Sequence, residues 1–147
     1  MPYSIAPQRF AAPLLTPQVI GPVSVEFQHT ATAVLHELQV SAEPEVQPLI
    51  AGTRWRFQFQ PMEQQLNLLR PPPEPDQVLL GLFTAPPPTV TIFESNIRLV
   101  ASRDGQGLRE KVREVMIHEL QHRFGLNHTA DRAAAWLSPG FGVPGES

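Results

Sequence analysis

Three histidines and a glutamate are gathered near the carboxyl end of the chain, in the segment MIHELQHRFGLNH over residues 116–128. If this segment is helical, His118 and His122 lie one turn apart on the same face, because helical residues four apart stand above one another. Two imidazoles in that arrangement suit a zinc ion, which takes nitrogen ligands at about 2 Å and usually has three protein ligands in catalytic sites. The spacing therefore predicts a metal site on a helix.

Residues after the second histidine provide a third ligand. Gly125 allows the chain to leave the helix, and His128 follows three residues later. Glu119 lies about 100° around the helix from His118, which is oblique for a ligand but suitable for a general base that takes a proton from a metal-bound water. We expect one Zn²⁺ per chain, although three imidazoles discriminate weakly between zinc and neighbouring divalent ions.

The tetrapeptide HELQ also occurs earlier in the chain, in AVLHELQV over residues 33–40. There His36 is followed four residues later by Val40, so the segment offers one imidazole and an apolar side chain. We interpret His36 as a histidine on a helix surface. The two copies therefore differ in the residues that follow the four shared letters.

Composition excludes several classes of function. The chain has 147 residues, a net charge of −3 and no cysteine. The charge argues against nucleic acid as a partner, and no apolar run approaches the roughly 18 residues of a membrane span. Without cysteine there are no disulfides and no thiolate ligands. We expect one domain in the cytoplasm, with no nucleic-acid or membrane partner.

Seventeen prolines mark the boundaries of that domain. They are dense in residues 1–18, 70–76 and 84–89, so we expect a proline-rich extended arm over residues 1–20. A single folded domain is expected over residues 21–137, and a flexible tail over residues 138–147.

Apolar periodicity predicts an α+β fold. The second long helix has apolar residues at four-residue steps, and His118 faces away from that stripe. In the first strand Trp55, Phe57 and Phe59 are expected to share a buried face. We expect three or four strands in a small, mostly antiparallel sheet, packed on two main helices of which the second carries the histidines. The predicted helices are Ser24–Val40, Leu108 to about Leu126 and Asp131–Leu137, the strands are Thr53–Gln60, Val78–Phe83 and Thr89–Glu94, and a turn lies at Asp104–Gly107.

Read in full, the histidine segment is H-E-x-x-H-x-x-G-x-x-H, which matches the long zinc-binding consensus of the metzincin metallopeptidases at every specified position. From Ser24 to His128 the chain also resembles the small zincin-like metallopeptidases of bacteria. The similarity includes a leading helix and the segments LLGLF (Leu79–Phe83), TVTIFESNIR (Thr89–Arg98) and LREKVREV (Leu108–Val115), the first two of which it suggests are strands.

This resemblance implies a minimal zincin-like domain over residues 21–137 and a zinc metalloendopeptidase that acts on peptides or proteins. It also implies that an extended substrate pairs with the edge strand of the sheet. By similarity the edge strand is Thr89–Glu94, with Thr89, Val90, Thr91, Ile92 and Phe93 beside the substrate. The same run is equally compatible with an ordinary edge strand.

The sequence departs from the family pattern in three places. The methionines are Met1, Met62 and Met116, so no Met-turn follows the third ligand. The small bacterial proteins often have an acidic residue at that ligand position, which makes Asp131 a reserve for His128. The proline-rich start and residues 61–76 have no counterpart in the resemblance.

Several alternatives remain open. Tyr3 is the only tyrosine, and no oxyanion-stabilising side chain is apparent. The chain is therefore also compatible with a weakly active or inactive zinc-binding relative that has a regulatory or scaffold role.

Pro72 and Pro75 are spaced as in ligands of polyproline-binding domains. The N-terminal arm is a candidate latency segment, and Glu114 and Asn127 are candidates for orienting the zinc-binding imidazoles.

Overall fold

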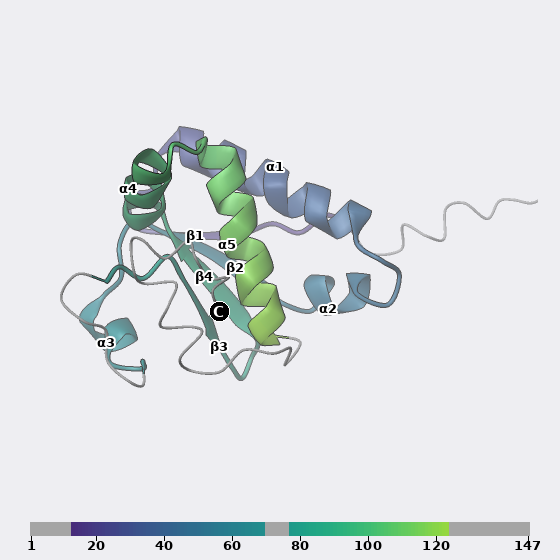
Figure 1. Cartoon of the computed structure of the whole chain (residues 1–147). Coiled ribbons are helices and arrows are strands. Elements are labelled where there is room, and N and C mark those ends of the chain that lie inside the picture. Colours follow the sequence, from purple (N-terminus) through teal and green to yellow (C-terminus); the bar gives the residue numbers. More distant parts are fainter. Residues whose placement is uncertain (1–12, 70–76, 124–147) are drawn as a thin grey trace, which may run out of the picture.

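The structure, a computed structural model, describes residues 13–69 and 77–123, the last two of these by their backbone alone. Over these ranges a four-stranded sheet is packed against helices (Figure 1). The α+β class and the small sheet on two main helices, α1 and α5, are confirmed. In chain order the elements are β1 (Gln18–Ile20), α1 (Val25–Ser41), α2 (Gln47–Ala51), β2 (Arg54–Gln58), α3 (Glu63–Leu66), β3 (Gly81–Thr84), β4 (Thr89–Phe93), α4 (Glu94–Asp104) and α5 (Leu108–Arg123).

The sheet has the order β1-β2-β4-β3, and the prediction that it is mostly antiparallel is wrong. β2 pairs in parallel with both β1 and β4, and only β3 with β4 is antiparallel. Parallel neighbours need a crossover connection, which α1 provides between β1 and β2. The sequence pattern assigns residues 18–20 to an extended arm, so it does not predict the strand β1 or the crossover that follows it.

Helix α1 begins where the sequence predicts. The Ser24 hydroxyl oxygen accepts a hydrogen bond from the backbone N–H of Phe27 at 3.1 Å, as an N-cap residue does. The predicted stripe of Phe27, Ala31, Val34 and Leu38 is buried. A capped start and an apolar stripe thus fix both the position and the facing of this helix.

The start of α1 is bound to the start of α4 through Glu94. The Glu94 carboxylate accepts hydrogen bonds from the Ser24 N–H at 2.9 Å, the Ser24 hydroxyl at 2.7 Å and Arg98 Nε at 2.8 Å. Burial by itself would raise the pKa of Glu94, but these hydrogen bonds outweigh it and lower the pKa. The buried carboxylate is therefore held in its charged form.

The strand suggested for residues 89–98 is shorter than the resemblance implies. β4 ends at Phe93 and α4 begins at Glu94 without an intervening residue. Gly105, with φ 67°, ends α4 in the left-handed conformation, which confirms the turn predicted at residues 104–107.

The main core lies between one face of the sheet and the two long helices. Trp55, Phe57, Val90 and Ile92 face α1 and the predicted α5 stripe of Val112, Met116 and Leu120. Leu79, Leu82 and Phe93 form a smaller cluster. Phe59 lies beyond the end of β2 and is 40% exposed, so its predicted burial is wrong.

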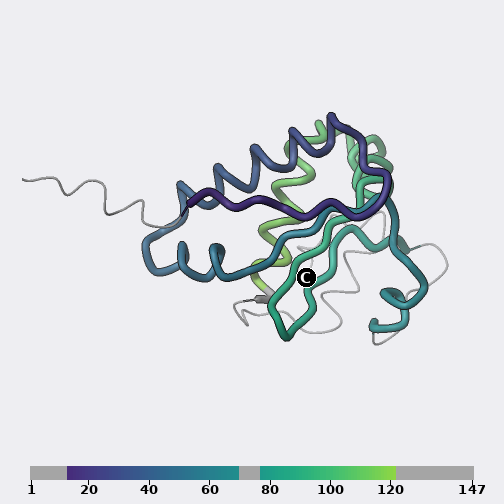
Figure 2. Tube along the Cα trace, turned by 180° about the vertical axis from the view of Figure 1, so that it is seen from behind, coloured from purple at the N-terminus to yellow at the C-terminus, as the bar shows by residue number. Residues whose placement is uncertain are grey.

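The N-terminal segment runs beside α1 and enters the sheet as β1 (Figure 2). His36 Nε2 lies 2.7 Å from the Leu15 carbonyl oxygen, and the Gln39 amide bonds to Pro13 O and Leu15 N. The last residues of the expected arm are thus bound to the domain. The start of the arm, the helix predicted over residues 131–137 and the predicted tail lie outside the described residues.

Candidate metal site on helix α5

The predicted metal ligands His118 and His122 both belong to α5, which is continuous from Leu108 to Arg123. They are therefore one helical turn apart, as the spacing predicts. His118 and Glu119 are 4% and 5% exposed. The side chain of His122 is not among those described, so the structure places this residue only by its backbone.

The position of β3 shows which side of α5 carries these residues. Met116 and Leu120 face the main core. Val115 and Glu119 lie against Gly81, the first residue of β3: an added Gly81 Cβ would be 3.0 Å from Val115 Cγ1 and 3.1 Å from Glu119 Cγ. His118 lies further round the helix from the core stripe, so its position is on the β3 side of α5.

Burial has a strong effect on the acid–base behaviour of Glu119. Removal from water raises the pKa of its carboxyl group to about 8 in the metal-free protein. With this pKa the carboxyl group is mostly protonated near neutral pH in the metal-free protein, and a cation bound nearby would favour the ionised form that a general base requires. The geometry thus combines a buried imidazole with an adjacent buried carboxyl group on one helix.

The assignment of Thr89–Phe93 as an edge strand is wrong. β4 is hydrogen-bonded to β2 on one side and to β3 on the other, and all five of its residues are buried. The prolines that suggested an edge lie in the 85–88 turn before the strand. Pro88 is compatible with the interior position because it serves only as an acceptor, through its carbonyl to the Arg54 N–H at 2.9 Å. Among the described strands, β3 is the edge that lies beside Glu119.

Comparison with known proteins gives a family. The family model of the zincin-like metallopeptidases matches residues 56–134, more than half of the chain. The chain belongs to this family. No curated protein and no solved structure matches it.

Membership of the zincin-like metallopeptidases implies zinc as the metal and a peptide or protein as the substrate. His118 and His122 suit such an ion in chemical type, because they are two imidazoles one turn apart on α5 and zinc favours nitrogen donors. Among residues 13–69 and 77–123, no group of three His, Cys, Asp or Glu side chains that could hold a metal is present.

Other predicted site residues lie outside the described ranges of this zincin-like chain. They are His128, its reserve Asp131, the orienting candidate Asn127, the docking residues Pro72 and Pro75, and Tyr3. The predicted third ligand, the polyproline docking and the missing oxyanion partner therefore stay predictions.

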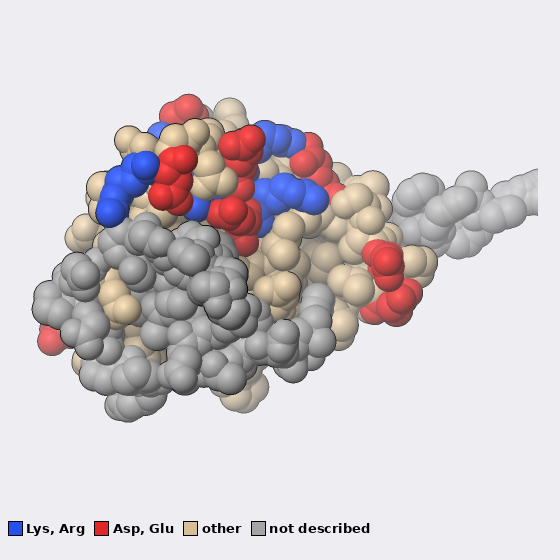
Figure 3. All heavy atoms as spheres, in the orientation of Figure 1, with Lys and Arg blue, Asp and Glu red and all other residues tan. Residues whose placement is uncertain are grey.

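Glu114, a candidate for orienting His118, takes part in a different interaction. Its carboxylate lies 2.8 Å from Lys111 Nζ, which also lies 3.0 Å from Asp104 Oδ2 at the end of α4. Figure 3 shows acidic and basic side chains interspersed over this helical surface. Lys111 therefore joins α5 to α4, and Glu114 pairs with Lys111 within α5.

Sequence reasoning missed Gly81, which lies against Glu119 in this zincin-like chain. A signal was present, since a lone glycine inside the apolar run LLGLF often marks a close approach of another backbone or helix. The periodicity that predicts the strand says nothing about which element approaches it.

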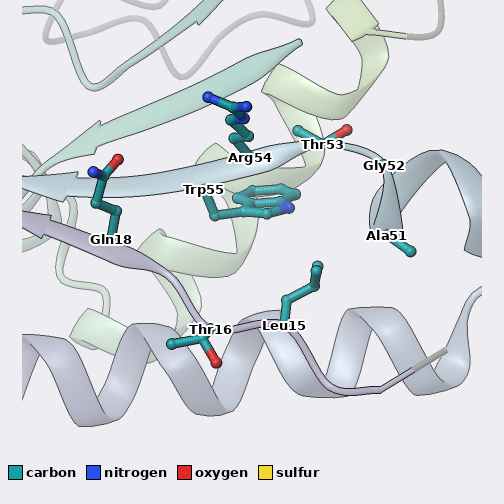
Figure 4. Close-up of a pocket in the computed structure, with 8 residues that line it drawn as sticks. All are labelled: Leu15, Thr16, Gln18, Ala51, Gly52, Thr53, Arg54 and Trp55. Atoms are coloured by element: carbon teal, nitrogen blue, oxygen red, sulfur yellow. The ribbon is translucent and has the colours of Figure 1, made fainter. Parts of the chain in front are cut away.

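The structure also has a hollow of about 490 Å³ on another part of the molecule (Figure 4). It lies beside the start of β2, and in Figure 4 the Arg54 side chain points away from Leu15 and Thr16. None of its lining residues is a predicted metal or substrate residue; they are Leu15, Thr16, Gln18, Ala51, Gly52, Thr53, Arg54 and Trp55.

No helix among the described residues is long and apolar enough to cross a membrane.

Proposed function

We propose that this chain is a zinc-dependent endopeptidase in which Glu119 is the general base. One Zn²⁺ per chain would be held by His118, His122 and His128, with Asp131 as the reserve third ligand. The observation that carries the proposal is the burial of Glu119 beside His118, on the helix that the family match covers and against an edge strand. The metzincin-type motif supports the same ligand set.

The chemistry divides between the ion and the chain. When bound, zinc supplies a Lewis acid that lowers the pKa of water toward 7 and polarises a carbonyl group. A Glu119 carboxylate oxygen accepts the proton of the attacking water and then delivers it to the nitrogen of the leaving amine. The low exposure of Glu119 limits competing solvent at the point of proton transfer.

We further propose that the substrate pairs with β3 in place of β4. The Leu80 carbonyl accepts a hydrogen bond from Phe93 N–H, and alternation along the antiparallel ladder then directs the N–H and C=O of Gly81 and Phe83 away from β4. These outward groups are suited to pairing with an extended peptide next to Glu119.

The β3 assignment can be tested at Phe83. Phe83→Pro removes an N–H group that points away from β4, while the N–H groups of β3 that bond to β4 are kept. Phe83→Ala removes only the side chain. We expect KM for a peptide to increase several-fold more in Phe83→Pro than in Phe83→Ala, with zinc content unchanged. Equal KM values in the two variants would contradict pairing at β3.

Digestion of a broad peptide library, with and without a chelator, tests the function itself. Cleavage that is lost with the chelator and restored by added zinc supports the peptidase. Zinc binding without cleavage would support the alternative of a regulatory or scaffold protein. Metal analysis of His128→Ala and Asp131→Ala beside the unaltered protein identifies the third ligand. Cytoplasmic placement and the lack of a nucleic-acid partner stay predictions.

A further inference from the structure

Gly81 occupies a place in β3 where a side chain has no room. A Cβ built on this residue would lie 3.0 Å from Val115 Cγ1, 3.1 Å from Glu119 Cγ and 3.3 Å from Glu119 Oε2. Its backbone is not in the left-handed region, so any residue can adopt its conformation. The requirement at this position is therefore for space beside the Glu119 side chain.

Neither of the elements that meet at Gly81 can easily move back. The Leu79 carbonyl accepts a hydrogen bond from Asn96 Nδ2 at 2.8 Å, and the Leu80 carbonyl accepts one from Phe93 N–H at 3.1 Å, which together hold the start of β3. On the other side Val115 is fully buried in α5, and its branched side chain has few rotamers in a helix. The Glu119 side chain is the most movable part of the contact.

We propose that Gly81 is a positioning residue, which sets the place of the Glu119 carboxylate by leaving it room against the edge strand. This inference rests on the proposed function for its kinetic consequence, but the contact itself can be tested without zinc. A methyl group at position 81 would displace the carboxylate by a few tenths of an ångström or more, while the histidines on α5 keep their places. Small displacements of a catalytic group have large kinetic effects.

The first experiment compares Gly81→Ala with Gly107→Ala in the full-length protein. Gly107 has no neighbour within 4 Å of an added Cβ and no left-handed backbone, so it is a matched glycine without the contact. For Gly81→Ala we expect kcat to fall about tenfold, with KM within about twofold and zinc content unchanged. Gly107→Ala should retain its kcat. An unchanged kcat in an active Gly81→Ala protein would overturn the proposal.

A stability cycle on the metal-free protein tests the contact separately. Melting temperatures are measured for the unaltered chain, Gly81→Ala, Glu119→Ala and the double variant, in the presence of a chelator. Because Glu119→Ala removes both Cγ and the carboxylate, Gly81→Ala should lower the melting temperature less in that background. An equal loss in both backgrounds would mean that position 81 does not act on Glu119, and would overturn the proposal.

These two measurements separate the possible failures. A chain that cleaves no peptide but shows the coupling would contradict the peptidase function and support the contact. If Gly81→Ala fails to fold, the same comparison is made on Gly81→Ala combined with Val115→Ala, which removes the closest of the three contacts. In that protein, recovery of the full kcat would show that Val115 accounts for the effect and would overturn the role assigned to Glu119.

Discussion

The two HELQ segments lie on different helices and take different roles. In α1, Glu37 is exposed and forms an ion pair with Arg109 of α5, while His36 and Gln39 bind backbone groups of the N-terminal segment. In α5, His118 and Glu119 are buried, and Glu119 lies against β3. The leucine is used alike in both copies, since Leu38 and Leu120 both belong to the main core.

This difference arises from what packs against each helix. His36 and Gln39 of the first copy bond to carbonyl and N–H groups of the N-terminal segment, so they hold that segment against α1. The second copy meets a strand whose glycine leaves room for a buried carboxyl group. A short motif thus acquires a chemical role from its neighbours in the fold. Equivalent substitutions should therefore have large effects on activity and zinc binding in the second copy and small effects in the first.

The largest expected difference is between Glu119→Gln and Glu37→Gln. Loss of the proposed general base should lower kcat/KM by about 10²- to 10⁴-fold, with zinc still bound. Glu37→Gln removes only an exposed ion pair, which contributes little. We expect it to stay within about twofold of the unaltered protein. Peptide cleavage rates check both, and a Glu119→Gln protein that is fully active with zinc bound would refute the assigned role.

Metal content should separate the histidines in the same way. His118→Ala and His122→Ala each remove a proposed ligand, so zinc bound after dialysis should fall from about one ion per chain to a small fraction of that. His36→Ala should retain its zinc, because His36 bonds to the Leu15 carbonyl. Metal analysis of the three proteins is the measurement, and zinc loss in His36→Ala would contradict the comparison.

Stability of the metal-free protein should depend on pH through Glu119. Its pKa is about 8 when folded and about 4.5 when unfolded, so the folded state retains a proton that the unfolded state releases. The free energy of unfolding should therefore fall as pH rises from about 4.5 to about 8. Glu119→Gln removes this loss and should be more stable at pH 7, by on the order of 3 kcal/mol.

Glu37→Gln is the control for this measurement, since Glu37 is exposed. Denaturant unfolding at pH 4.5 and pH 7, with a chelator present, gives the comparison. A Glu119→Gln protein with no greater advantage at pH 7 than at pH 4.5 would contradict the effect of burial.

The smallest effect is expected in the first copy. His36→Ala and Gln39→Ala each remove hydrogen bonds to residues 13–15 and should lower the free energy of unfolding by about 1 kcal/mol. Neither should change zinc content or kcat. Denaturant midpoints provide the test, and a loss of activity without a loss of stability would show that the N-terminal segment affects the site.

The long helices could be predicted because their signals are local. Ser24 caps α1, and the apolar stripes of both helices repeat within the element itself. The spacing of His118, Glu119 and His122 could be predicted for the same reason. Pairing between strands depends on residues far apart, so the parallel neighbours of β2 could not be read from its alternation. A continuous buried run, as in β4, is nevertheless typical of an interior strand in a parallel arrangement.

The end of β4 illustrates a second limit. Residues Thr89–Phe93 favour a strand, and because Ser95 and Asn96 are weak helix formers, the sequence does not predict that a helix follows. Tertiary contacts decide the matter, since Glu94 is fixed by Ser24 and Asn96 by the Leu79 carbonyl. Gly81 was missed for a related reason, because its importance depends on a helix that begins 27 residues later.

The hydrogen bonds between Ser24 and Glu94 have a consequence for how the chain folds. The two residues are 70 positions apart, yet they join the first turns of α1 and α4. The start of α1 thus gains its full set of partners only after a long loop has closed, which costs conformational entropy. We therefore expect that helix α1 does not form as an independent folding unit. Its amide protons should become exposed to exchange together with those of α4, as parts of one cooperative unit.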